Sequence, residues 1–173
     1  GLKYFVLSAL SSGLLLYGCS LIYGFSGSTN FDQISNNISE VQYGLTLGIV
    51  FILVGLAFKI SAVPFHMWAP DVYQGSPTSV TIFFAILPKI AALSVFIRFL
   101  YVPFINLIDQ WQTIIIFVSI ASMVFGAVAA IGQKNLKRLM AYSSISHMGF
   151  ALAGLAVGTN EGIQSSLIYI STY

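Results

Sequence analysis

The sequence predicts an all-α membrane protein that crosses the bilayer several times. Of its 173 residues, 57% are hydrophobic and only 7% are charged, and the mean hydropathy is +0.90. A soluble domain carries about 25% charged residues, so seven basic and five acidic side chains cannot cover a water-exposed surface. The apolar residues also form runs of about 20, the length of a helix that crosses the hydrocarbon core. We therefore expect a helical bundle surrounded mainly by lipid.

Five apolar runs and the start of a sixth give the predicted order of spans. They cover residues 3–24, 43–66, 77–100, 112–132 and 136–157, with the sixth at 162–173. Backbone groups in lipid must be paired within the segment, and these runs are too long and continuous for barrel strands. We expect one membrane domain over 1–173. Because the chain has no initiator methionine and stops inside an apolar run, we also expect it to be an internal piece of a longer protein.

The connections between the spans predict the orientation. Residues 26–40 form a polar loop and residues 101–111 an amphipathic link. The side with the N-terminus, the link at 70–76 and the turn at 132–138 holds four basic residues, namely Lys3, Lys134, Lys137 and Arg138. The opposite side holds one basic residue and four acidic ones, namely Arg98, Asp32, Glu40, Asp109 and Glu161. By the positive-inside rule, the N-terminal end should face the cytoplasm or the mitochondrial matrix.

Composition excludes several other classes of function. The net charge of +2 is too small to suggest a nucleic-acid partner. The single cysteine, Cys19, lies in an apolar run, so it offers neither a disulfide framework nor a cysteine metal site. The sequence has no glycine-rich phosphate loop and no metal-ligand spacing. We therefore expect no cofactor or metal in this chain.

Two lysines, Lys59 and Lys89, lie inside predicted spans. A lysine at the centre of a membrane helix costs about 2.5 to 3.5 kcal/mol, so each needs an explanation. Lys59 could extend its ammonium to the interface, and Lys89 could pair with a carboxylate from a helix outside this chain to hold the bundle together. Alternatively, because burial favours the uncharged amine, both could exchange protons during turnover. We favour a relay in which a proton passes from Lys59 to Lys89 through water.

Two prolines accompany these lysines. Pro64 lacks an amide hydrogen and clashes with the carbonyl four residues earlier, so the helix carrying Lys59 should break just after it. Broken helices at membrane depth occur where they face protein or a wet cavity. Pro88 directly precedes Lys89 and should loosen that helix in the same way. We predict structural breaks at both prolines.

Three further titratable residues have both a structural and a functional interpretation. His66 follows the Pro64 break and titrates near neutral pH, so it could carry a proton or sit as a hydrogen-bonded interfacial residue. His147 lies near Ser143, Ser144 and Ser146, which could equally serve as packing contacts between helices. Asp71 lies at a turn, where aspartate commonly caps the next helix or bonds its own backbone, and it could also transfer protons directly.

Three stretches carry a resemblance to a known family. They are "KYFVLSALSSGLLLYGCSLIYG", "FKISAVPFHMWAPDVYQGSPTSVTIFFAILPKIAAL" and "KRLMAYSSISHMGFALAG". Together they resemble membrane subunit N of the proton-pumping NADH:quinone oxidoreductase, respiratory complex I, whose mitochondrial counterpart is subunit 2. The resemblance covers the chain nearly end to end. It implies part of an antiporter-like fold built from inverted repeats.

The resemblance also implies roles for individual residues. Lys59 matches the lysine before the break of a discontinuous helix, and Lys89 matches the central lysine of the next helix. His66 and His147 match the histidines of "PFH" and "SSISH". The family's partner glutamate and its last relay lysine have no counterpart in this chain. The resemblance therefore implies the middle of a proton path.

The function implied is proton translocation that is coupled to quinone reduction elsewhere in a complex. NADH, FMN, iron–sulfur clusters and quinone would then belong to other parts of that complex. The partners would be neighbouring antiporter-like and small membrane subunits, and the location a bacterial or mitochondrial inner membrane. Two alternatives stay open, namely a subunit of a multisubunit cation/proton antiporter and a structural membrane scaffold.

Overall fold

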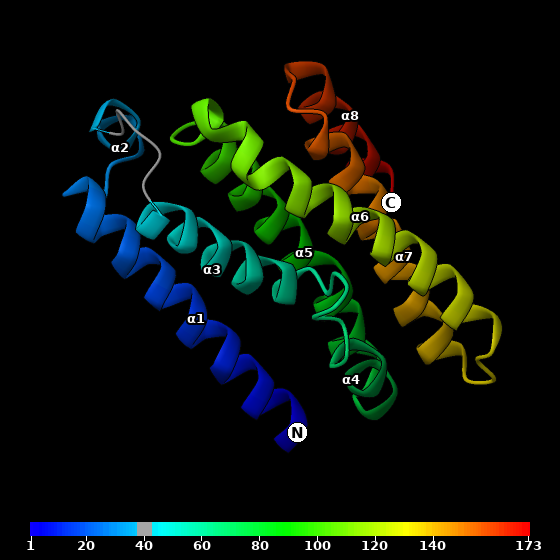
Figure 1. Ribbon diagram of the computed structural model, residues 1–173. Helices are drawn as coiled ribbons and strands as arrows, with labels where there is room; N and C mark the ends of the chain where they lie inside the picture. Colours follow the sequence, from blue (N-terminus) through cyan, green and yellow to red (C-terminus); the bar gives the residue numbers. More distant parts are fainter. Residues whose placement is uncertain (38–42) are drawn as a thin grey trace.

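The computed structural model describes residues 1–37 and 43–173, and all regular structure in this part of the chain is helical. This confirms the predicted all-α class. Figure 1 shows the helices: α1 (Leu2–Ser26), α2 (Phe31–Asn37), α3 (Tyr43–Lys59), α4 (Ala69–Gly75), α5 (Thr78–Tyr101), the 3₁₀ helix η1 (Ile105–Leu107), α6 (Ile108–Ile131), α7 (Leu136–Ala156) and α8 (Asn160–Thr172). The predicted spans match α1, α3 and α5 to α8 in order.

Four helical segments of the described chain are long and apolar enough to cross a membrane. They are Leu2–Ser26, Thr78–Tyr101, Ile105–Ile131 and Leu136–Ala156. The fifth apolar helix, α3, has 17 residues and is mostly buried among its neighbours. The last, α8, has 13 residues and starts at the Thr159 cap, whose hydroxyl accepts from the N–H of Gly162.

The span predicted at 43–66 is shorter as a helix than expected, because α3 ends at Lys59. Ser61 adopts a left-handed conformation with φ of 61°. The N–H of Ala62 donates to the carbonyl of Ala57 (2.9 Å), and the N–H of Ser61 donates to that of Phe58 (3.1 Å). This is the hydrogen-bond pattern of a Schellman helix end. These bonds give hydrogen-bond donors to carbonyls in the last turn of α3, and the left-handed residue turns the chain away from the helix axis.

The break near Pro64 is therefore confirmed, although the helix ends before that proline. The chain continues through turns and re-enters helical structure at α4. The indole N–H of Trp68 reaches back and donates to the carbonyl of Phe58 (2.9 Å). The N–H of Val63 donates to the hydroxyl of Ser122 on α6 (2.9 Å). Polar contacts from neighbouring elements thus replace the helical bonds lost at membrane depth.

The predicted break at Pro88 is wrong, because α5 continues as one helix from Thr78 to Tyr101 through this proline. Pro88 has no amide hydrogen for the carbonyl of Phe84, so one helical bond is missing. Membrane helices tolerate such an internal proline when the surrounding bonds and packing are kept. The sequence also missed α2 inside the predicted polar loop, where the side chain of Asn30 accepts from the N–H of Asp32 (2.9 Å). Glu40 lies outside the described residues.

Close helix pairs are made by glycine and serine. A Cβ atom on Gly126 of α6 would lie 2.6 Å from the backbone nitrogen of Ser146 on α7, so only glycine fits there. The hydroxyl of Ser119 donates to the carbonyl of Gly149 (2.7 Å), and that of Ser146 donates to the carbonyl of Met123 (3.3 Å). Small residues that let backbones approach are typical of membrane helix pairs. They join α6 and α7, which run side by side in Figure 1.

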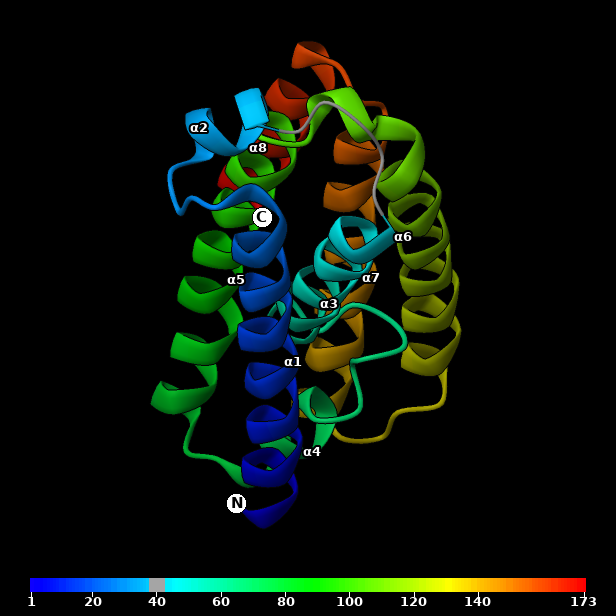
Figure 2. The ribbon, with the colours of Figure 1, turned by 60° about the vertical axis from the view of Figure 1, so that its left-hand side comes forward.

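Different connections and short helices lie at the two ends of the bundle. The N-terminus, α4 and the turn between α6 and α7 lie at one end, and α2 and the connection between α7 and α8 lie at the other (Figures 1 and 2). This agrees with the grouping of the connections from their sequence. The basic residues of the first group therefore gather at one end.

Candidate functional site

The most unusual side chain of the bundle is Lys89, which is 1% exposed in the middle of α5. Its ammonium donates to the hydroxyl of Ser144 on α7 (2.7 Å). That hydroxyl donates in turn to the carbonyl of Ala141 (2.9 Å). A buried lysine is thus held by one neutral hydroxyl that already has an acceptor of its own.

The ring of Tyr73 on α4 completes the immediate surroundings of this lysine. Its centroid lies 5.7 Å from the Lys89 Nζ, within the range of a cation–π contact. The described ion pairs both involve Asp71, so no carboxylate of this part of the chain neutralises Lys89. Pairing with a carboxylate of a helix outside this chain stays an alternative. A hydroxyl and a ring stabilise the charge less than a carboxylate would, so the uncharged amine remains accessible.

His147 lies one helical turn beyond Ser144 on α7. Its Nδ1 is 2.6 Å from the hydroxyl of Tyr169 on α8, and its ring lies 4.5 Å from the ring of Tyr173. The hydroxyl of Tyr173 also lies near Ser144. Tyr173 thus lies near both the hydrogen-bond partner of Lys89 and the ring of His147. The structure brings these two predicted residues into one polar region.

Lys59 and His66 lie on either side of the break. Lys59 is the last residue of α3 and half-buried, and its Nζ lies 6.0 Å from the ring of Phe58. The ring of His66 packs against Phe125 of α6 at 4.4 Å, and its Nδ1 has no hydrogen-bond partner among the described residues. No contact described here joins either residue to Lys89. The site therefore has two parts, the break with Lys59 and His66 and the region of Lys89 and His147.

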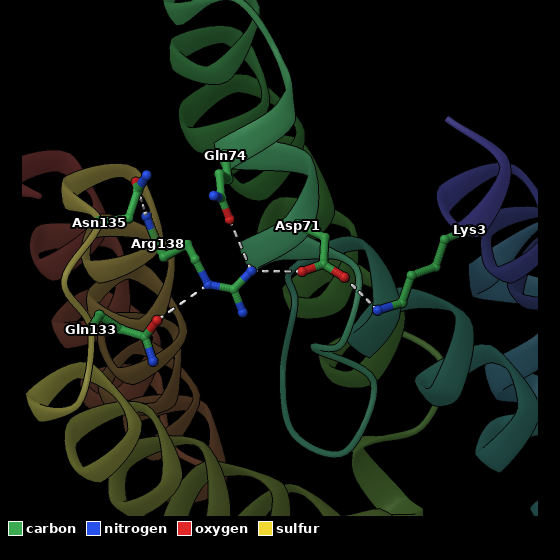
Figure 3. Close-up of polar contacts among 6 residues, drawn as sticks. All are labelled: Lys3, Asp71, Gln74, Gln133, Asn135 and Arg138. Carbon is green, nitrogen blue, oxygen red and sulfur yellow. Dashed lines mark hydrogen bonds and ion pairs between the residues drawn. The ribbon is translucent and has the colours of Figure 1, made fainter.

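A separate ionic cluster lies at the end of the bundle that holds the N-terminus (Figure 3). Asp71 of α4 pairs with Lys3 of α1 and with Arg138 of α7, whose Nη1 is 2.8 Å from its Oδ1. Arg138 also donates to Gln74 (3.1 Å) and to Gln133 (3.2 Å). These contacts tie the short helix α4 to the ends of two long helices.

The charges of this cluster act on Asp71. The Lys3 ammonium and the Arg138 guanidinium hold the pKa of the Asp71 carboxyl below its usual value. Lys137 adds a further link, since its ammonium donates to the carbonyl of Ser76 (2.8 Å). Asp71 therefore bridges helices, whereas the sequence suggested a local cap. Sequence spacing gave no signal for this, because its partners are 68 and 67 residues away.

The comparisons with known proteins agree with this architecture. Residues 1–173 match the family model described as NADH:quinone oxidoreductase/Mrp antiporter, transmembrane. The chain belongs to this family. Within the described residues, no group of His, Cys, Asp and Glu side chains could hold a metal ion.

Several members of this family are closely similar to the chain. NADH-quinone oxidoreductase subunit N of Pelagibacter ubique is 79% identical over 100% of the chain and 37% of its own length. The subunit of the same name from Rhodospirillum rubrum is 61% identical, over 100% of the chain and 36% of its own length. The chain thus spans a little over a third of these relatives.

Solved structures from two kinds of complex share the fold. A chain of respiratory complex I from Thermus thermophilus with bound aureothin has a TM-score of 0.79 and 38% identity, over 98% of this chain and 36% of that one. A chain of the Mrp complex from Dietzia has a TM-score of 0.89 and 28% identity, over 96% of this chain and 31% of that one. The antiporter-like membrane fold is common to both.

Proposed function

We propose that this chain forms part of a proton-translocating membrane subunit of an NADH:quinone oxidoreductase. The observation that carries the proposal is Lys89, a lysine buried at membrane depth with a hydroxyl as its hydrogen-bond partner. A permanent charge there is costly, and the described chain supplies no acid to offset it. A group that can take up and release a proton avoids that cost in its neutral state.

Lys59, His66 and His147 are the other proposed members of the path. Lys59 lies at the end of α3, where the chain leaves the helix and polar backbone can face water. His66 follows in the break, and His147 lies on α7 beyond the hydrogen-bond partner of Lys89. A change in charge or hydration at Lys59 would shift its proton affinity and send a proton toward Lys89. The histidines would pass protons through their ring nitrogens.

The wider assembly is part of the same proposal. Relatives named NADH-quinone oxidoreductase subunit N cover the whole chain, which favours an assembly with other membrane subunits of that enzyme. The redox groups, namely NADH, FMN, iron–sulfur clusters and quinone, would be bound by other parts of it. The four basic residues gathered at the N-terminal end favour the cytoplasmic or matrix side of an inner membrane for that end.

The test is proton pumping by the whole enzyme with Lys89→Ala in the full-length subunit. Inverted membrane vesicles would be assayed for proton uptake and for NADH:quinone turnover, with assembly checked on native gels. The matched control is Lys134→Ala, which removes the same group from an exposed turn. We expect Lys89→Ala to lose pumping and the coupled turnover, and Lys134→Ala to keep both. Normal pumping by an assembled Lys89→Ala enzyme would contradict the proposal.

A second candidate is a subunit of a cation/proton antiporter. The high TM-score to a chain of the Mrp complex favours it. Such a protein would use the buried lysines but would exchange protons for Na⁺ without NADH. Acidification of vesicles that depends on a Na⁺ gradient and not on NADH would support this alternative. A structural scaffold, in contrast, would tolerate the loss of Lys89 in both assays.

A further inference from the structure

Tyr73 of α4 has a buried hydroxyl without a partner. Its side chain is 1% exposed, and the hydroxyl has no hydrogen-bond partner among the described residues. A buried polar group in this state costs free energy, and phenylalanine would fill the same volume without that cost. Such a hydroxyl calls for an explanation other than packing.

The surroundings of this hydroxyl are those of the buried lysine. The ring of Tyr73 faces the Lys89 ammonium at 5.7 Å, and its hydroxyl lies near Ser144, the hydrogen-bond partner of Lys89. Three polar groups from three helices, α4, α5 and α7, thus meet at one buried point. Two of them bond to each other, and the third has a free hydrogen-bonding capacity.

The short helix that carries Tyr73 is firmly placed. Two residues before it, Asp71 binds Lys3 and Arg138 (Figure 3). On the other side of α4, the hydroxyls of Ser76 and Thr81 bond to each other (2.9 Å). Tyr73 therefore has a fixed position against Lys89, as a group that acts in proton transfer requires.

We propose that the Tyr73 hydroxyl binds a water molecule beside Lys89. Together with Ser144, it passes protons between Lys89 and this water. In this step an N–H bond of the ammonium breaks and an O–H bond forms on the water. The ammonium gives its proton to Ser144, whose own proton turns from the Ala141 carbonyl to Tyr73, and Tyr73 releases its proton to the water, so both hydroxyls are unchanged afterwards. The lysine becomes neutral, the water becomes hydronium, and the reverse step reloads the lysine. This inference rests on the proposed proton translocation and assigns Tyr73 to it.

The experiment is Tyr73→Phe in the full-length subunit of the assembled enzyme. The substitution keeps the ring against Lys89 and removes only the hydroxyl. The matched control is Tyr17→Phe, the same change on an exposed ring that packs against Phe51. Proton uptake by inverted vesicles, NADH:quinone turnover and the solvent deuterium isotope effect on turnover would be measured for each variant and for Lys89→Ala.

We expect Tyr73→Phe to assemble and to lose pumping and turnover severalfold, with a larger isotope effect. The loss should stay below the ~100-fold typical of a full acid–base group, because water can partly replace a hydroxyl. Tyr17→Phe should match the native enzyme. If Lys89→Ala is inactive and Tyr73→Phe is normal, this inference is wrong and the proposed function stands. A Tyr73→Phe subunit that fails to assemble also overturns it, because the hydroxyl would then have a structural partner.

Discussion

The two charged regions of this bundle are built in opposite ways. Around Asp71, an acid whose side chain is 42% exposed pairs with two cations and bonds directly to both. Around Lys89, a cation that is 1% exposed has one neutral hydroxyl and a tyrosine ring. Paired charges in contact with water hold elements in place at little cost. A buried charge without an acid keeps its neutral form within reach, which suits a group that must release a proton.

The helix α4 connects the two regions. Asp71 and Tyr73 are two residues apart on this short helix. Asp71 is the acid of the ionic cluster, and the ring of Tyr73 faces Lys89. The ionic cluster therefore holds the same short helix that carries Tyr73 to the buried site. Substitutions in the two regions should therefore separate effects on function from effects on stability.

The largest effect is expected from Lys89→Met, which replaces the buried cation by an apolar side chain of similar length. Pumping should be abolished, since methionine has no proton to exchange. Thermal stability should stay the same or rise, because the cost of a buried lysine disappears and Ser144 keeps its bond to Ala141. Pumping in vesicles and the melting temperature of the purified enzyme would be measured together. A clear loss of stability would instead indicate that Lys89 holds the helices together.

A smaller effect, on stability, is expected from Asp71→Asn. Two partly exposed ion pairs are weakened, which should cost about 0.5 to 2 kcal/mol if each pair contributes up to ~1 kcal/mol. Thermal melting of the purified enzyme measures this loss, and Asp109→Asn serves as the control. That substitution makes the same change at an aspartate outside the two ion pairs. Equal melting of the two variants would show that the cluster contributes nothing.

The pH dependence of the melting temperature, compared between the native enzyme and Asp71→Asn, gives a second measurement. Lys3 and Arg138 lower the pKa of Asp71 in the folded state. Its contribution to stability is therefore fully present above the unfolded carboxyl pKa of ~3.9 and is lost as the pH falls through the lower folded value. The melting temperature of the native enzyme should exceed that of Asp71→Asn at pH 6, and the gap should close below about pH 4. A gap that widens on acidification would contradict this sign.

Much of the fold could be predicted from the sequence. The apolar runs predicted six helices in the observed order, because about 20 apolar residues fit only a helix in lipid. The alternation of the spans grouped the helix ends correctly, since the N-terminus, α4 and the turn between α6 and α7 share one end (Figure 2). The break near Pro64 followed from the covalent structure of proline.

The errors arose where neighbouring elements decide the outcome. The end of α3 at Lys59 depends on a left-handed Ser61, a conformation that sequence patterns assign to glycine. Pro88 was expected to break α5, but the helix continues through this proline. The partners of Lys89, namely Tyr73 and Ser144, come from separate helices, and only the folded chain brings them together. The roles of Lys59, Lys89, His66 and His147 in proton transfer stay predictions.

The smallest effect is expected from Arg138→Lys, and it tests how closely the two regions are coupled. The guanidinium donates from Nη1 to Asp71 and Gln74 and from Nε to Gln133 at the same time, a fork that the single nitrogen of lysine cannot reproduce. The charge beside Asp71 remains, so we expect a loss of about 0.3 to 1 kcal/mol in stability and unchanged pumping. Thermal melting and vesicle assays measure the two quantities. If Arg138→Lys lowers pumping as much as Tyr73→Phe does, the position of α4 controls proton transfer at Lys89. The ionic cluster would then belong to the proton machinery, and the contrast between a structural and a functional region would not hold.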